Sequence, residues 1–172
     1  MYNKFGQFID GKWQLSEKKE TYDVINPATE EVIGSASKAS SLEVQKALKS
    51  AERGLKVWSN TTPWQRSYVL RKIADLMREK KDVLAKWLTL EVGKPLTEGV
   101  GEVGGAADIF EWNAEETKRI YGQTVQSRFP ETRVHVYYQP VGVVAALIPW
   151  NFPIVLAARK ISTALAAGCS VI

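Results

Sequence analysis

The sequence predicts an α/β protein in which a helical region precedes an incomplete parallel sheet. Amphipathic helical patterns fill most of residues 40–120, an apolar run follows over 141–148, and a further helix leads into the start of another strand at 170–172. A strand, a helix and a second strand in that order are typical of a βαβ unit with parallel strands. With 172 residues, 45% of them hydrophobic, the chain can bury one ordinary core.

The first forty residues are typical of short strands joined by turns. The turn-forming pairs Asp10-Gly11 and Asn26-Pro27 separate runs of strand-forming residues. The predicted strands cover residues 7–9, 12–15, 22–25 and 32–36. Ser40 and Glu43 then match a capping box, and apolar residues recur at helical spacing over 44–58, which predicts a helix.

Three more helices are predicted before residue 120. Pro63 suits the first position of a helix, which should bury an apolar stripe. That stripe consists of Val69, Ile73, Leu76 and Met77. Asp82 is expected to cap a break before the apolar pattern resumes, and Gly93 followed by Pro95 ends that helix. Helical spacing returns over 96–120.

The spacing of apolar residues changes from helical to alternating after residue 120. Apolar and polar residues alternate over 133–139, and this segment is predicted to pair with 123–127 as a two-stranded arm. The run 141–148 is apolar on both faces, as in a parallel strand covered on both sides. Pro149 ends that strand.

The tail of the chain predicts the rest of the βαβ unit. A helix is expected over 154–167, stopped by Gly168, with a strand beginning at Ser170. An incomplete sheet should leave an apolar edge exposed at 143–147 and at Val171.

The composition excludes several classes of protein. One cysteine, Cys169, and one histidine, His135, cannot form an internal disulfide or the usual cysteine-rich or histidine-rich metal sites. Residues 1–7 lack a basic region followed by an apolar run, which disfavours secretion. The apolar stretch 141–158 contains two prolines, which favours a buried strand and helix over a membrane span. We therefore expect a reduced, metal-free, cytoplasmic protein.

The net charge of +4 is unevenly distributed. Residues 63–86 carry seven basic and three acidic side chains, whereas residues 91–119 carry seven acidic and three basic ones. Neighbouring segments of opposite sign favour exposed helix faces that pair with each other. A nucleic-acid-binding stripe along 63–86 is the weaker alternative.

Gly99, Gly101 and Gly104 match the spacing of a dinucleotide-binding loop. That loop needs a strand before it and a helix N-terminus after it, whereas a helical pattern runs into these glycines. Glu102 would also bring negative charge toward a pyrophosphate. We expect the glycines to permit close helix packing instead.

Cys169 and His135 occupy positions typical of structural residues. Cys169 follows a helix stop and has no base near it in sequence, which predicts a buried and inert thiol. His135 falls on the polar face of the predicted arm, which predicts a solvated or hydrogen-bonded ring.

The segment 148–153 is the most informative for function. Asn151 lies between Pro149 and Pro153 where a sheet strand ends, and ligands of α/β folds bind at such ends. A buried amide there is costly unless it has a role, and its NH₂ can donate to an oxygen that gains negative charge. Trp150 offers a flat wall to a planar ligand. The alternative is that Asn151 caps the helix after it, and spacing alone leaves both interpretations open.

Seven stretches in the same order resemble the N-terminal part of the aldehyde dehydrogenase superfamily. They are Phe8-Ile-Asp-Gly-Lys-Trp13, Asn26-Pro-Ala-Thr29, Leu90-Glu-Val-Gly-Lys-Pro95, Glu111-Trp-Asn-Ala-Glu-Glu with Lys118-Arg-Ile-Tyr-Gly122, Gln139-Pro-Val-Gly142, Pro149-Trp-Asn-Phe-Pro153 and Ala164-Leu-Ala-Ala-Gly168. The resemblance implies the N-terminal portion of that fold, with helices, an incomplete Rossmann-like parallel sheet and a β-arm. It also implies a homo-oligomer that oxidises a small aldehyde to an acid with NAD or NADP.

The resemblance assigns roles to individual residues. Asn151 becomes the donor to the oxyanion formed when a cysteine attacks the aldehyde, and Ile148, Pro149 and Trp150 join it in the cofactor wall. Arg159 matches the arginine that holds the substrate carboxylate in members similar to succinate-semialdehyde dehydrogenases, although lactaldehyde-type relatives can carry one there too. A guanidinium suits that task because it binds two oxygens at once. The alternative is a solvated pair of Arg159 with Lys160.

The resemblance also implies a division of the chain. Residues 1–120 would be strands and helices of the cofactor-binding domain, 121–140 an oligomerisation arm, and 141–172 the start of a truncated Rossmann-like unit. No residue matches the nucleophilic cysteine or the general-base glutamate, so we expect the 172 residues alone to be inactive. The alternative is a non-catalytic module that associates with a full-length partner through the arm.

Overall fold

The computed structural model describes residues 6–172, so the expectation about a leader in residues 1–7 falls largely outside it. Two antiparallel hairpins begin the described chain, as predicted. They are formed by β1 (Gln7–Ile9) with β2 (Lys12–Gln14), and by β3 (Thr21–Ile25) with β4 (Val32–Ser37). Asp10 and Gly11 have φ values of 55° and 74°. They therefore form the tight turn that this pair of residues favours.

Helix α1 (Ser41–Trp58) begins at the predicted capping box. The buried carboxylate of Glu43 accepts the backbone N–H of Ser40 at 2.6 Å and that of Glu17 at 2.7 Å. Glu43 therefore closes the first turn of α1 and also ties the loop after β2 to that turn.

Glu43 should make the stability of the chain depend on pH. The N–H groups of Ser40 and then Glu17 lower the pKa of Glu43 from 4.5 to about 2. Because the folded-state pKa lies below the unfolded one, the stabilisation is complete above pH 4.5 and is lost as the pH falls toward 2. The chain should therefore unfold at lower urea concentration near pH 3 than near pH 7, and Glu43→Gln should reduce this difference. The exposed Glu52→Gln on the same helix is the control, and an unchanged difference in Glu43→Gln would contradict the expectation.

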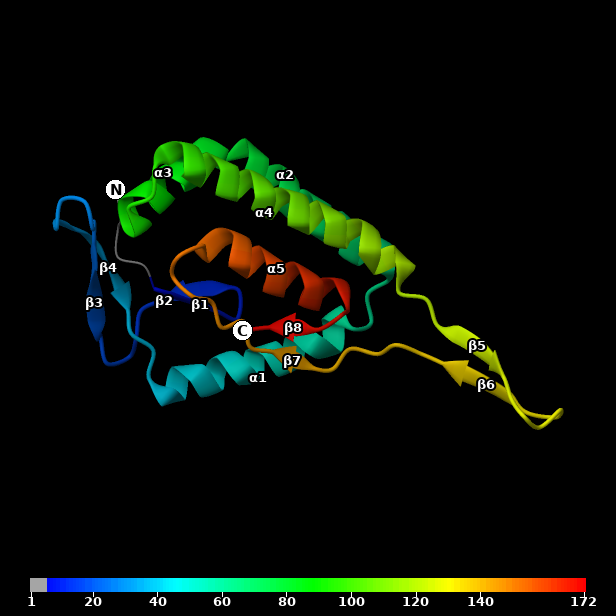
Figure 1. Cartoon of the computed structure of the whole chain (residues 1–172). Coiled ribbons are helices and arrows are strands. Elements are labelled where there is room, and N and C mark those ends of the chain that lie inside the picture. The colour runs from blue at the N-terminus through cyan, green and yellow to red at the C-terminus, as the bar shows by residue number, and fades with distance from the viewer. Residues whose placement is uncertain (1–5) are drawn as a thin grey trace.

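Three helices follow α1 and pack as one layer (Figure 1). They are α2 (Pro63–Glu79), α3 (Lys81–Val92) and α4 (Leu96–Glu116), with a 3₁₀ turn over Thr117–Arg119. Pro63 and Gly93 delimit them as predicted, with Gly93 left-handed at φ 79°. Asp82 does not cap the break between α2 and α3, because Lys80 occupies the cap position and Asp82 lies in the first turn of α3.

The buried face of α2 differs from the predicted stripe. Leu70 and Ala74 are fully buried, whereas Val69 and Leu76 are 38% and 39% exposed. The predicted stripe was therefore right for Ile73 and Met77, which pack against the core, and wrong for Val69 and Leu76. The core cluster joins α2, α4 and the last helix, and alanines of α4 supply much of it. Small side chains let these helices approach closely.

The opposite charges of α2 and α4 pair with each other, as expected from their distribution. Arg78 contacts Asp108 at 2.8 Å and Glu111 at 2.5 Å, and Arg71 contacts Glu111 and Glu115. These ion pairs are partly exposed, so each contributes little to stability. They pair two of the seven basic side chains of residues 63–86 with the acidic face of α4.

The chain ends in a βαβ unit. Strand β7 (Val143–Val144) pairs in parallel with β8 (Ser170–Val171), and α5 (Pro153–Ala166) connects them. Helix α5 packs on α4, while α1 covers the other face of the two strands (Figure 1). Gly168, with φ 89°, ends the helical segment as predicted.

The predicted strand 141–148 is much shorter in the structure. Val143 and Val144 pair with β8, Ala146 also donates its backbone N–H to the carbonyl of Ile172 at 2.8 Å, and Val141 and Leu147 are 90% and 80% exposed. The segment is therefore not covered on both faces within the described chain. The expected exposed apolar edge is found at Leu147, whereas Val143 and Val171 are half-buried.

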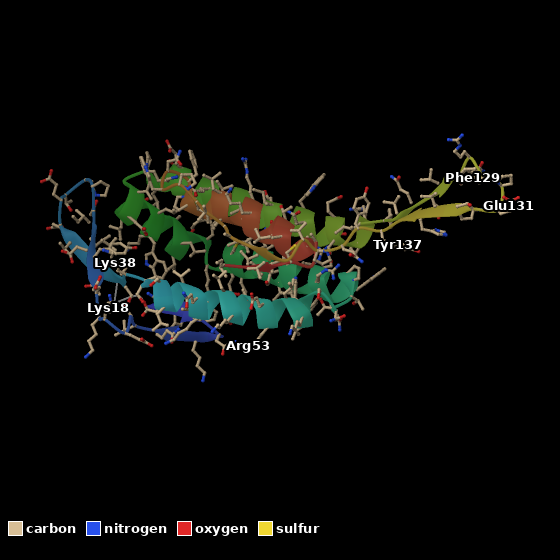
Figure 2. All side chains as sticks on the ribbon, turned by 90° about the horizontal axis from the view of Figure 1, so that it is seen from below. Lys18, Lys38, Arg53, Phe129, Glu131 and Tyr137 are labelled. Carbon is tan, nitrogen blue, oxygen red and sulfur yellow. The ribbon has the colours of Figure 1, made fainter. Side chains whose placement is uncertain are left out.

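The predicted arm is present. Strand β5 (Gln123–Gln126) pairs with β6 (Arg133–Val136), and both strands are exposed along their whole length. The arm projects away from the helices, with Phe129 and Glu131 at its far end and Tyr137 near its base (Figures 1 and 2). Within residues 6–172, no helix is both long and apolar enough to cross a bilayer.

Candidate functional site

The segment 149–153 forms a corner between β7 and α5, which we call the α5 corner. Pro153 is the first residue of α5, where its missing N–H costs no hydrogen bond, and Phe152 is the N-cap with φ −138°. Phe152 has no side-chain oxygen, so it cannot cap the helix. Asn151 lies just outside the helix, in a turn.

Asn151 neither caps α5 nor is buried. The N-cap position belongs to Phe152, so the cap interpretation is wrong, and the residue is exposed, so the expected burial of the amide is also wrong. Its carboxamide makes no hydrogen bond with the described residues 6–172. Its backbone carbonyl, in contrast, accepts a hydrogen bond from Nζ of Lys94 at 3.0 Å. The main chain of Asn151 is thus tied to the protein while its side-chain donors stay available.

Glu102 supplies the cap that α5 lacks. Its Oε1 accepts the backbone N–H of Ile154 at 2.9 Å and of Val155 at 3.1 Å, although it lies 52 and 53 residues earlier in the chain. These N–H groups are among those that a helix leaves unpaired at its start. A carboxylate there also interacts favourably with the positive end of the helix dipole.

Lys94 completes the arrangement. Its ammonium pairs with Oε2 of Glu102 and lies 4.1 Å from the ring centre of Phe152, within the range of a cation–π contact. Gly93 ends α3 in the left-handed conformation and so directs the chain toward the position of Lys94. A Cβ on Gly93 would lie 2.7 Å from Cγ of Pro27. The tight link between α3 and α4 therefore requires glycine.

The other predicted site residues lie on exposed surface around the α5 corner. Trp150 is 76% exposed and Ile148 is 37% exposed, and Pro149 is exposed as well. Arg159 lies seven residues after Phe152, on the outer side of α5, and its guanidinium has no partner among residues 6–172. Lys160 is exposed as well, so the alternative that both are solvated side chains stays open. The structure brings these residues together along one corner and the helix that follows it.

An apolar groove of about 430 Å³ lies on another side of α5. Its walls include Leu84, Trp87, Phe110, Pro153 and Ile161. Neither Asn151 nor Arg159 lines it, so it is separate from the polar groups of the α5 corner.

The three other sequence motifs lie as follows. Cys169 is 2% exposed, which confirms the expected burial of the thiol, and the His135 ring on the arm bonds Oγ1 of Thr124 on the opposite strand at 3.2 Å. The glycine pattern lies inside α4, so it is not a phosphate loop. A Cβ at Gly99 would lie 2.9 Å from the carbonyl oxygen of Ala85, so close packing explains Gly99. At Gly101 and Gly104 a Cβ would meet nothing within 4 Å, so packing does not explain them.

Sequence reasoning missed the roles of Lys94 and Glu102. One signal was available, because Glu102 falls at helical spacing between the buried residues Gly99 and Ala106. A carboxylate on a buried face needs a partner. The identity of that partner depends on contacts between α4 and a segment some fifty residues later, which a local pattern does not contain.

The chain belongs to the aldehyde dehydrogenase family, which matches residues 13–172. It is 44% identical over 165 residues to a glutarate-semialdehyde dehydrogenase of Pseudomonas aeruginosa, covering 96% of this chain and 34% of that protein. It is also 44% identical to an NADP(+) succinate-semialdehyde dehydrogenase of Escherichia coli, covering 95% and 34%. A crystal structure of an E. coli NADP-dependent enzyme superposes with a TM-score of 0.95 at 44% identity, covering 97% of this chain and 35% of that one.

The chain therefore spans about a third of the length of these relatives. Its fold is the N-terminal portion of the aldehyde dehydrogenase fold.

Proposed function

We propose that this chain is the N-terminal part of an NAD(P)-dependent aldehyde dehydrogenase that oxidises an aldehyde bearing a carboxylate, such as succinate semialdehyde. The observation that carries the proposal is the state of Asn151: its main chain is fixed by Lys94, and its carboxamide has no internal partner among residues 6–172. A fixed main chain beside an uncommitted NH₂ group supports this role, because an oxyanion donor needs a defined position and a free N–H.

The residues of the α5 corner would act as follows. The NH₂ group of Asn151 donates to the aldehyde oxygen as that oxygen becomes negative. Arg159 binds the distant carboxylate, and its exposed guanidinium, which no group of the described chain engages, supports that role.

Ile148, Pro149, Trp150 and Asn151 would form one wall of the cofactor site. The exposed, largely apolar surface of Ile148 and Trp150 fits a planar ring. The cofactor, NAD or NADP, supplies the hydride acceptor, and NADP is named for two of the similar proteins.

The arm would serve homo-oligomerisation. Its strands have no neighbour beyond each other among residues 6–172, and apolar side chains such as Val125 and Tyr137 are exposed on it. Unpaired strand edges bind other strands readily. We also propose that residues 1–120 and 141–172 belong to the cofactor-binding region and that 121–140 is a separate oligomerisation element.

The carboxylate preference is tested with Arg159→Ala in the complete gene product. We expect kcat/KM for succinate semialdehyde to fall by about 10- to 150-fold, the equivalent of losing a charge-assisted hydrogen bond. The value for an uncharged aldehyde of similar length should change little. Lys160→Ala, which removes a neighbouring positive charge, is the matched control and should retain the preference.

Equal losses on both aldehydes would contradict the role of Arg159. The 172-residue chain alone should form no NAD(P)H in the same assay, since no residue in it matches the family's nucleophile or general base.

A further inference from the structure

We propose that Lys94 and Glu102 are positioning residues for Asn151: the buried ion pair fixes the α5 corner on both sides of the carboxamide. This inference rests on the proposed role of Asn151 as the oxyanion donor. Neither Lys94 nor Glu102 would touch the reacting atoms.

Lys94 fixes the main chain at the donor itself. Its Nζ donates to the carbonyl oxygen of Asn151 at 3.0 Å, and the same ammonium lies over the ring of Phe152. Fixing that carbonyl fixes the peptide plane between residues 151 and 152. The direction of the Cα–Cβ bond of Asn151 is thereby restricted, although no group of residues 6–172 binds its side chain.

Glu102 fixes the chain immediately after the donor. Its bonds to the N–H groups of Ile154 and Val155 hold the first turn of α5 against α4. The turn that carries Asn151 is therefore tied to the α3–α4 link through Lys94 and to the body of α4 through Glu102. This double attachment compensates for the lack of a capping side chain at Phe152.

The burial of the pair favours a role beyond stability. The side chains of Lys94 and Glu102 are 7% and 1% exposed. Removing two charges from water is costly, and apolar residues of similar size often stabilise such positions equally well. A buried ion pair is useful where it fixes a specific geometry, and here the geometry that it fixes is the position of the Asn151 donor.

The test uses Lys94→Met combined with Glu102→Gln in the complete gene product. This double variant removes both charges, so no unpaired charge is buried, and the amide oxygen introduced at position 102 can still accept from α5. We expect kcat to fall by about 10- to 100-fold, as for a displaced catalytic group, with a smaller change in KM. Lys86→Met combined with Glu98→Gln makes the same substitutions at exposed positions and should leave kcat unchanged.

Repeating the double substitution in an Asn151→Ala variant distinguishes a positioning role from a purely structural one. In Asn151→Ala, the Lys94→Met and Glu102→Gln substitutions should cost little further activity, because they act through the missing carboxamide. Equal losses with and without Asn151 would overturn the proposal, as would an unchanged kcat in the double variant. If Asn151→Ala alone keeps full activity, the proposed role of Asn151 as oxyanion donor is wrong, and the positioning role that rests on it is wrong as well.

Amide hydrogen exchange at Ile154 and Val155, measured for the double substitution in the complete gene product, provides the structural readout. Protection equal to that of the parent would show that the α5 end is still folded and would support a loss of positioning alone. Loss of this protection together with equal activity losses in both backgrounds would make the pair purely structural and overturn the proposal.

Discussion

Asn151→Ala should lower kcat of the complete gene product by about 100- to 1000-fold, the range found when one oxyanion donor is removed. The physical reason is that the amide interaction strengthens as the oxygen gains charge, so the loss falls on the transition state more than on substrate binding. Asn151→Asp should be similarly impaired, because it keeps the shape of the side chain but replaces the donor with an acceptor of like charge to the oxyanion.

Steady-state formation of NAD(P)H from succinate semialdehyde provides the measurement. Asn60→Ala is a control for the substitution, since Asn60 is exposed and its side chain bonds only the carbonyl of Lys56 within the described chain. A kcat for Asn151→Ala equal to that of the parent would show that the exposed carboxamide has no part in the chemistry.

Leu70→Ala should destabilise the 172-residue chain by about 2–5 kcal/mol, whereas Leu76→Ala should cost clearly less. Both leucines lie on α2, but Leu70 is fully buried in the core between α2, α4 and α5, and Leu76 is 39% exposed. The substitution therefore creates a cavity in the core at position 70, whereas at position 76 it removes a side chain that is already partly exposed to water.

Urea unfolding followed by circular dichroism gives the two free energies of unfolding under identical conditions. Comparable losses would mean that α2 buries the face containing Leu76, as its sequence pattern predicted. The two substitutions thus test the orientation of the helix directly.

The element boundaries were largely predictable because local chemistry determines them. Pro63, Gly93 and Gly168 delimit helices through backbone conformation, and the Ser40–Glu43 capping box starts one. The rotation of α2 was not predictable in this way. Arg66 is buried because its guanidinium donates to the carbonyls of Thr61 and Ala166, which a hydrophobic pattern does not anticipate.

An offset of one residue turns a helix by about 100°. Taking Val69 in place of Leu70 therefore left the predicted stripe overlapping the buried face only in part. The predicted strand 141–148 is confirmed over Val143–Val144, with a further backbone bond from Ala146 to Ile172. Its full extent depends on pairing partners, which an apolar run alone does not specify.

The sequence singled out site residues only where the signal is local or comes from the family resemblance. Two prolines around a polar amide drew attention to Asn151, and the family resemblance added Arg159. Lys94 and Glu102 lie 57 and 52 residues away from the groups they bind. Only the packing of α4 against α5 brings them together.

The separation between Glu102 and the first turn of α5 has a consequence for the order of assembly. During synthesis the carboxylate leaves the ribosome 52 residues before the N–H group that it will bind. Helix α4, which carries Glu102, can therefore fold before the first turn of α5 has been synthesised. The turn that contains Asn151 then docks against a helix that is already formed.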